Sequence, residues 1–82
     1  MSLDIPDYSP ETGVVLKWED DAEIKVSTQD GEVLIEANAD GLTSLANHLL
    51  NLAQTAVPPG THIHLDDNSL EDGSSPLIIE KL

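Results

Sequence analysis

The chain of 82 residues contains no cysteine, no phenylalanine and no arginine, and it has one tryptophan and one tyrosine. Without cysteine, neither a disulfide framework nor a thiolate metal site can form, and small secreted domains usually depend on such cross-links. A reducing, cytoplasmic setting therefore fits the composition best. Because hydrophobic residues make up 39% of the chain but aromatic residues only 2%, we expect a thin, aliphatic core.

Positive charge is also scarce, since three lysines stand against 16 acidic residues and the formal net charge is -13. The chain has no arginine to neutralise a phosphate group by a bidentate contact, so the charge argues against direct binding to nucleic acid. A negative field of this size would steer a basic protein toward the chain. The simpler interpretation is that acidic surfaces keep small proteins soluble.

Long apolar runs are absent too, and none approaches the length of a membrane span. The first residues, MSLDIPDYSPE, lack the basic start and apolar middle of a signal peptide. We expect an unanchored protein with a flexible acidic arm over residues 1–12. Residues 13–82 are expected to form a single domain.

Three short segments, at residues 14–18, 23–28 and 32–37, have the alternation or the β-branched composition of strands. Asp30-Gly31, between the last two, is the signal of a tight hairpin turn. We therefore expect a three-stranded meander. Its core side would hold Ile24, Val26, Val33, Ile35 and Ala37, and its open side Glu23, Lys25, Ser27, Glu32, Leu34 and Glu36.

A helical period replaces the alternation after residue 40, and Asp40 is the expected N-cap. Val57-Pro58-Pro59 should end the helix, because proline lacks an amide donor. His48 is expected to be half-buried at the edge of the apolar stripe. That stripe comprises Leu42, Leu45, Ala46, Leu49, Leu52, Ala53 and Ala56.

Two further strands are expected at residues 61–66 and 76–82. The order is then three strands, one helix and two strands. This order predicts a two-layer α+β fold, in which an antiparallel sheet of about five strands carries the amphipathic helix on one face. The other face of the sheet is left open.

His62, His64 and Asp66 recur at every second residue of HIHLD, so they should stand together on the open face. Two imidazoles and a carboxylate could hold zinc or iron with free coordination positions. The favoured interpretation is a docking surface, because short His-x-His patterns often arise by chance. Metal binding through these three residues is the minority interpretation, and we expect no cofactor.

The segment from Asp66 to Gly73, DDNSLEDG, has the acidity of a calcium loop but not its spacing. When Asp66 and Asn68 are placed at the first two ligand positions, Leu70 falls on the third and Glu71 on the invariant glycine. A turn with exposed carboxylates, open to a partner's Lys or Arg, fits better. We find neither a cysteine nucleophile nor a glycine-rich phosphate loop, so catalysis is not expected.

The sequence from residue 38 onward resembles the immunity protein 32 family of bacterial polymorphic toxin systems. Three pieces carry the resemblance: the helix GLTSLANHLL, the strand PGTHIHLD and the closing LEDGS with LIIEK. The resemblance implies a cytoplasmic immunity protein that binds and blocks a cognate toxin domain. Pro76 departs from the family pattern, so the last strand should begin after it or lie at an edge.

We therefore expect a protein inhibitor whose acidic surface meets a basic toxin, for instance a nuclease, with Trp18 as an added apolar anchor. The alternatives are a homodimeric module, paired through its open sheet face or through the edge strand at residues 77–82, and a His-dependent metal-binding protein. The expected partner-binding residues are Glu32, Leu34, Glu36, His62, His64, Asp66, Asp67, Glu71 and Asp72.

Overall fold

The structure is a computed structural model that describes residues 3–82, in which one helix and four strands occur. The elements are β1 (Ile24–Gln29), β2 (Glu32–Ala37), α1 (Ala39–Leu52), β3 (His62–Leu65) and β4 (Leu77–Glu80). The α+β class is as predicted. The strands, however, form two small antiparallel sheets, β1 with β2 and β3 with β4, so the expected five-stranded sheet is not confirmed.

The β1–β2 hairpin follows from the turn signal in the sequence. Asp30 and Gly31 have positive φ angles of 52° and 79°, which the two central residues of a type I′ turn require. The register pairs Ile24 with Ala37 and Val26 with Ile35. The core-side residues therefore share one face of the hairpin, as predicted.

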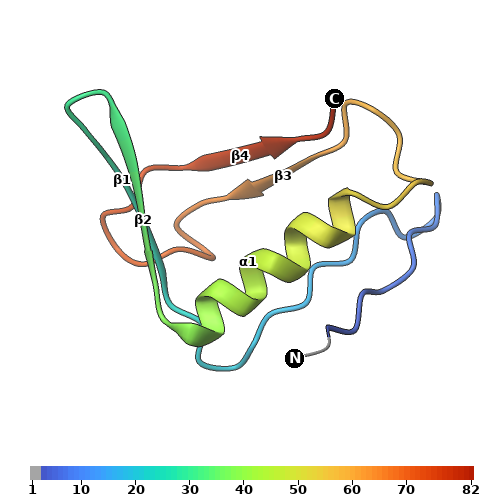
Figure 1. Cartoon of the computed structure of the whole chain (residues 1–82), viewed down its shortest axis with the longest axis horizontal. Helices are drawn as coiled ribbons and strands as arrows, with labels where there is room; N and C mark the ends of the chain where they lie inside the picture. The colour runs from blue at the N-terminus through green and yellow to red at the C-terminus, as the bar shows by residue number, and fades with distance from the viewer. Residues whose placement is uncertain (1–2) are drawn as a thin grey trace.

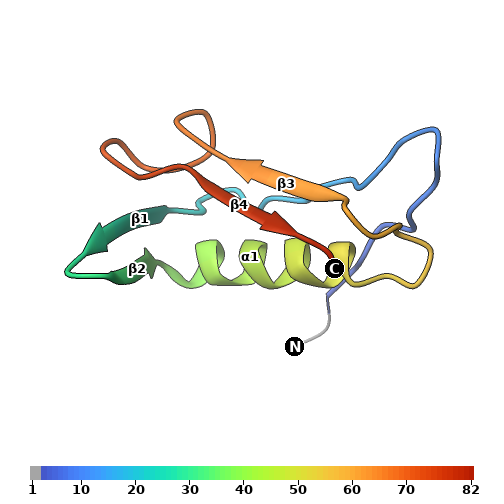
Figure 2. The same cartoon turned by 90° about the horizontal axis from the view of Figure 1, so that it is seen from above.

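The two hairpins take different places around α1, and the β1–β2 hairpin meets the helix at its N-terminal end (Figures 1 and 2). Figure 2 shows β3 and β4 lying over α1, and in both views the turn of the β1–β2 hairpin projects beyond the N-terminal end of the helix (Figures 1 and 2). The buried apolar residues are Ile24, Val26, Leu52, Val57, Ile63, Leu65 and Leu70, all aliphatic as expected.

Because the hairpin projects beyond the helix, part of its predicted core side is exposed to solvent. Val33 and Ile35 lie on the core side of β2, yet they are 62% and 43% exposed. The prediction that these two side chains are buried is wrong, because the helix and the second sheet cover the hairpin only near Ile24 and Val26. An apolar strip along β2 is left open to solvent.

No strand forms over residues 14–18, so this prediction is wrong; between residue 3 and β1 the structure has only one isolated bridge, from Ser9 to Gly13. The segment runs alongside α1 instead (Figure 1). Side chains of the helix supply hydrogen bonds that a neighbouring strand would otherwise supply. The flexibility expected of residues 1–12 stays a prediction, as does the single domain over 13–82, and residues 1 and 2 lie outside the described residues.

Polar side chains of the helix face this N-terminal segment. Ser44 Oγ accepts a hydrogen bond from the Glu19 amide at 2.9 Å, and Asn47 Nδ2 donates to the Asp4 carbonyl at 3.1 Å. Gln54, just past the helix, accepts from the Tyr8 amide at 3.0 Å. These bonds tie an extended segment to α1 without a ladder of strands.

The helix consequently turns its polar side inward. Its buried positions include Ser44, Asn47, His48 and Asn51, whereas Leu42 and Leu49 are 56% and 48% exposed. The predicted packing of the whole apolar stripe against the sheet is wrong. Leu52 is the one member of that stripe that becomes fully buried, with Leu45 packed at the edge of the core.

Asn38, not Asp40, is the N-cap of α1. Asn38 Oδ1 accepts from the Gly41 amide at 2.8 Å and from the Glu23 amide at 3.0 Å, and Nδ2 donates to the Asp21 carbonyl at 2.8 Å. An asparagine directly after β2 can bridge the helix and the segment that leads into β1 at once. Asp40 is left in the first turn, where its charge suits the helix dipole.

The helix also ends before the predicted proline stop. It closes at Leu52, and the carbonyl groups of Gln54 and Val57 accept hydrogen bonds from Lys81 Nζ at 2.7 and 2.8 Å. Lys81, at the end of the chain, thus holds the turn that follows the helix. At the other end of its hairpin, β4 begins at Leu77, directly after Pro76, as the departure from the family pattern predicted.

Candidate functional site

The acidic loop, defined as residues 66–76 between β3 and β4, is fixed to β1 by backbone hydrogen bonds. The Glu71 amide donates to the Ile24 carbonyl and the Ser75 amide to the Val26 carbonyl, both at 2.8 Å. Ser74 Oγ accepts from the Val26 amide at 3.1 Å. The loop therefore lines the edge of β1 that faces away from β2.

Local turn chemistry decides which carboxylates of the loop stay free. Asp66 Oδ1 accepts from the Asn68 amide at 3.1 Å, and the Asp66 carbonyl accepts from the Leu70 amide at 2.7 Å. Leu70 is 6% exposed and belongs to the core, so it anchors the middle of the loop. Asp66 is half-buried, whereas Asp67, Glu71 and Asp72 are exposed.

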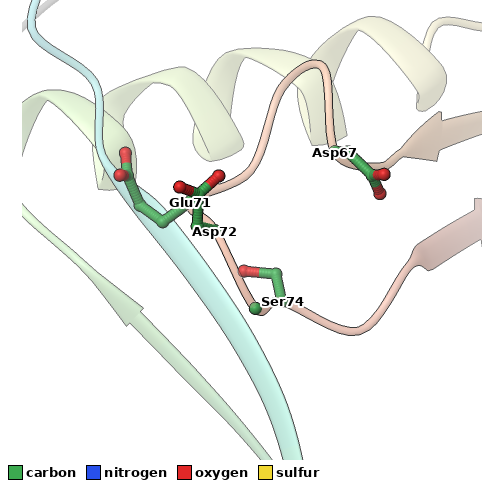
Figure 3. Close-up of a pocket in the computed structure, with 5 residues that line it drawn as sticks. Asp67, Glu71, Asp72 and Ser74 are labelled. Atoms are coloured by element: carbon green, nitrogen blue, oxygen red, sulfur yellow. The ribbon is translucent and has the colours of Figure 1, made fainter.

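Two shallow hollows meet at Glu71. One is lined by Asp67, Glu71, Asp72, Gly73 and Ser74, and Figure 3 shows Glu71 and Asp72 beside β1 with Asp67 at the other end of the loop. The second hollow is lined by Glu71 together with residues of the hairpin: Glu23, Lys25, Glu36, Ala37 and Asn38.

The structure thus brings part of the predicted site together. Glu36 and the acidic loop share one surface through Glu71. Glu32 and Leu34 lie farther along the hairpin, where they line a third hollow beside the Asp30 turn. The anchoring serines of the loop, Ser74 and Ser75, were not predicted, and their sequence gives no signal for a contact with β1.

The histidines form a separate feature on the outer face of β3 and β4. His62 and His64 are exposed and Ile63 and Leu65 buried, as the alternation predicted. The two imidazole rings have centroids 4.9 Å apart. Across the ladder His62 pairs with Glu80, with 3.9 Å between His62 Nδ1 and a Glu80 carboxylate oxygen.

Metal binding gains no support from this arrangement. Within residues 3–82, no group of three or more His, Cys, Asp or Glu side chains is placed to hold a metal ion. Asp66 lies past the end of β3 and its carboxylate accepts from the chain's own backbone. The ladder of three ligands expected from HIHLD is therefore not assembled.

Little positive charge remains to offset the acidic surface. Lys81 donates to two backbone carbonyls, and Lys17 lies 3.4 Å from an Asp4 carboxylate oxygen. Lys25 lines the second hollow between acidic neighbours. The carboxylates of the acidic loop have no salt bridge within the part of the chain that the structure describes.

His48, in the middle of α1, lies in an environment that is unusual for a titratable side chain. Its side chain is fully buried, and neither ring nitrogen has a hydrogen-bond partner among the described residues. Trp18 packs against it edge to face, with ring centroids 4.3 Å apart. Burial lowers the pKa of His48, because the charged imidazolium loses its hydration.

A pH-dependent loss of stability follows from the lowered pKa of His48. Below about pH 6.5 the unfolded chain takes up a proton at this histidine and the native protein resists it, so acidification favours unfolding. Between pH 7.5 and 5.5 we expect the wild type to lose up to about 1.4 kcal/mol more unfolding free energy than His48→Leu. Urea unfolding of both proteins at the two pH values measures this, and parallel pH dependence would contradict it.

These features define a small α+β protein that displays unpaired carboxylates on a loop anchored to its sheet. A comparison with protein-family models matches residues 32–82, more than half of the chain, to the model described as Immunity protein 32. The chain belongs to this family of immunity proteins, which confirms the resemblance seen in the sequence.

Neither a search of curated proteins nor a search of solved structures found a match. The family match begins at Glu32, so β2, the helix, β3, the acidic loop and β4 fall within it. Within residues 3–82, the helix lacks the length and apolarity that crossing a bilayer requires.

Proposed function

We propose that this chain binds a cognate bacterial toxin domain and blocks it by covering its surface, with no catalysis of its own. The observation that carries the proposal is the acidic loop: its backbone is bonded to β1 while Glu71 and Asp72 stay exposed. Membership of an immunity protein family supports a toxin as the partner.

Fixed carboxylates suit this task better than mobile ones. A side chain held on an anchored loop loses less freedom on binding, so more of the electrostatic attraction appears as affinity. Opposite charge on the partner would also speed the encounter at low salt. A basic toxin, such as a nuclease with a positive substrate-binding surface, is the partner that this surface fits.

The histidines of β3 extend the proposed interface by polar contact rather than by metal ligation. His62 and His64 are exposed beside Ile78, whose side chain is 58% exposed. An apolar group rimmed by polar side chains is a common composition for a docking patch. Asp66 contributes through the turn that it stabilises.

Binding of the purified chain to the toxin domain encoded beside its gene tests the proposal. We expect a complex at low salt whose affinity falls by about tenfold or more as salt is raised, since exposed charge pairs are screened. Metal analysis of the same sample tests the alternative that His62 and His64 bind a metal ion. A stoichiometric metal ion together with no captured toxin would refute the proposal.

A further inference from the structure

The outer edge of β2 carries backbone groups that face away from β1. Along β1, the carbonyls of Ile24 and Val26 accept hydrogen bonds from the acidic loop, whereas the Glu23 carbonyl accepts from the Asn38 amide. In an antiparallel pair the inward-facing and outward-facing residues alternate. The backbone N–H and C=O groups of Ile24 and Val26 therefore point away from β2. The backbone groups of the residues paired with the outward-facing residues of β1 point away from β1 in the same way.

The outward-facing partners on β2 are Val33 and Ile35. The register places Val33 opposite Thr28 and Ile35 opposite Val26, so the amide and carbonyl of both residues point to the free edge. β2 is the terminal strand of its sheet in the described residues. The side chains along it are open as well, with Val33 62%, Leu34 48% and Ile35 43% exposed.

An exposed edge of this kind is a template for another strand. Backbone hydrogen bonds would supply affinity, and the alternating side chains would supply specificity. On β2 the apolar side chains of Val33, Leu34 and Ile35 lie between two carboxylates, Glu32 and Glu36, and both carboxylates are exposed.

The flanking carboxylates disfavour the self-pairing in which the two β2 strands overlap along their whole length. If a second copy of the chain paired antiparallel so that Val33 bonds with Ile35, Glu32 of each copy would face Glu36 of the other. Like charges directly opposite each other destabilise a strand pair. A partner strand with Lys or Arg at those two positions would instead gain an attractive pair at each end.

We propose that the toxin adds an extended strand antiparallel to β2. That strand would carry a basic residue opposite Glu32, three apolar or β-branched residues beside Leu34 and its neighbours, and a basic residue opposite Glu36. This inference rests on the proposed function and specifies how the partner is held. Glu36 lines the same hollow as Glu71, but the acidic loop borders β1, so the added strand would lie at the opposite edge of the hairpin and the toxin would have to span both strands to reach the loop.

Hydrogen exchange of single amides in the complex with the neighbouring toxin domain tests the strand addition. In the free chain, the outward-facing amides of Val33 and Ile35 should exchange readily, whereas those of Leu34 and Glu36 face β1 and serve as internal controls. Binding should slow exchange at Val33 and Ile35 by at least about tenfold, since each would gain a hydrogen bond.

Val33→Pro provides a second test, with Val33→Thr as the matched control. Proline removes the outward N–H while leaving the β1 ladder intact, and edge strands tolerate it. We expect Val33→Pro to weaken toxin binding about tenfold and Val33→Thr to change it less than about twofold. If Val33→Pro does not fold, hydrogen exchange at Val33 and Ile35 in the wild-type complex decides whether a strand is added to β2.

The outcomes separate this inference from the function on which it rests. A complex in which Val33 and Ile35 exchange as fast as in the free chain overturns the strand addition alone. Failure to form any complex overturns the proposed function and the inference with it. Protection of the two amides that rises with concentration in the chain alone would identify a second copy as the occupant and also overturn it.

Discussion

The double substitution Glu71→Lys with Asp72→Lys is expected to weaken toxin binding by at least about 100-fold, because each reversal replaces an attraction with a repulsion at the interface. Both side chains are exposed, and the residue of this loop that belongs to the core is Leu70. The free energy of unfolding, measured with urea, should therefore stay within about 0.5 kcal/mol of the wild-type value. Titration calorimetry measures the affinity.

A matched control separates the loop from the overall charge. Asp7→Lys with Glu11→Lys changes the net charge by the same amount, on exposed residues of the N-terminal segment. We expect the control pair to lower affinity by less than about tenfold, through the general field alone. Equal losses from the two pairs would remove the acidic loop from the interface.

Gly41→Ala is expected to destabilise the fold by about 3 kcal/mol, the upper range for an overpacked site. Alanine normally favours a helix over glycine by about 1 kcal/mol, so the expected sign is reversed. The reason is the close approach of α1 to β1: a Cβ at Gly41 would collide with the Glu23 carbonyl oxygen and lie 3.1 Å from Ala37 Cβ. Backbone, rather than a flexible side chain, would have to move.

Urea unfolding followed by circular dichroism checks this prediction. Ala39→Gly, an exposed change at the start of the same helix, sets the scale and should cost about 1 kcal/mol or less. A Gly41→Ala protein as stable as the wild type would show that the helix and β1 do not approach as closely as described.

The β1–β2 hairpin could be predicted from sequence because its signals are local. Asp30-Gly31 fixes the turn, and the turn fixes the register that places Ile24 opposite Ala37. The same holds for HIHL, whose alternation gives the observed order of exposed and buried residues in β3. Short-range patterns of this kind leave few alternatives.

The orientation of α1 could not be predicted because distant hydrogen bonds decide it. Glu19 bonds to Ser44 across 25 residues, and Tyr8 bonds to Gln54 across 46. The hydrophobic period favoured burial of Leu42 and Leu49, yet the extended N-terminal segment needs partners for its amides and carbonyls. No local pattern marks the polar face of a helix as a partner for such a segment.

For the candidate site, sequence identified the exposed acidic residues but not their arrangement. Asp67, Glu71 and Asp72 are exposed as a turn rich in Asp and Gly would suggest. Ser74 and Ser75 bond to β1 and so bring the acidic loop beside Glu36. Ser74 and its partner Val26 are 48 residues apart in the sequence. The exposed edge of β2 was missed for a similar reason, because alternation predicts a face but not how far the core extends.

Rescue of bacterial growth tests inhibition through the acidic loop most directly. The toxin domain encoded beside the gene is induced in cells that also express this chain, either as wild type or as Glu71→Lys with Asp72→Lys. We expect growth with the wild type and arrest with the double variant at equal protein levels. Arrest with both proteins, or equal growth with both, would contradict inhibition through the acidic loop.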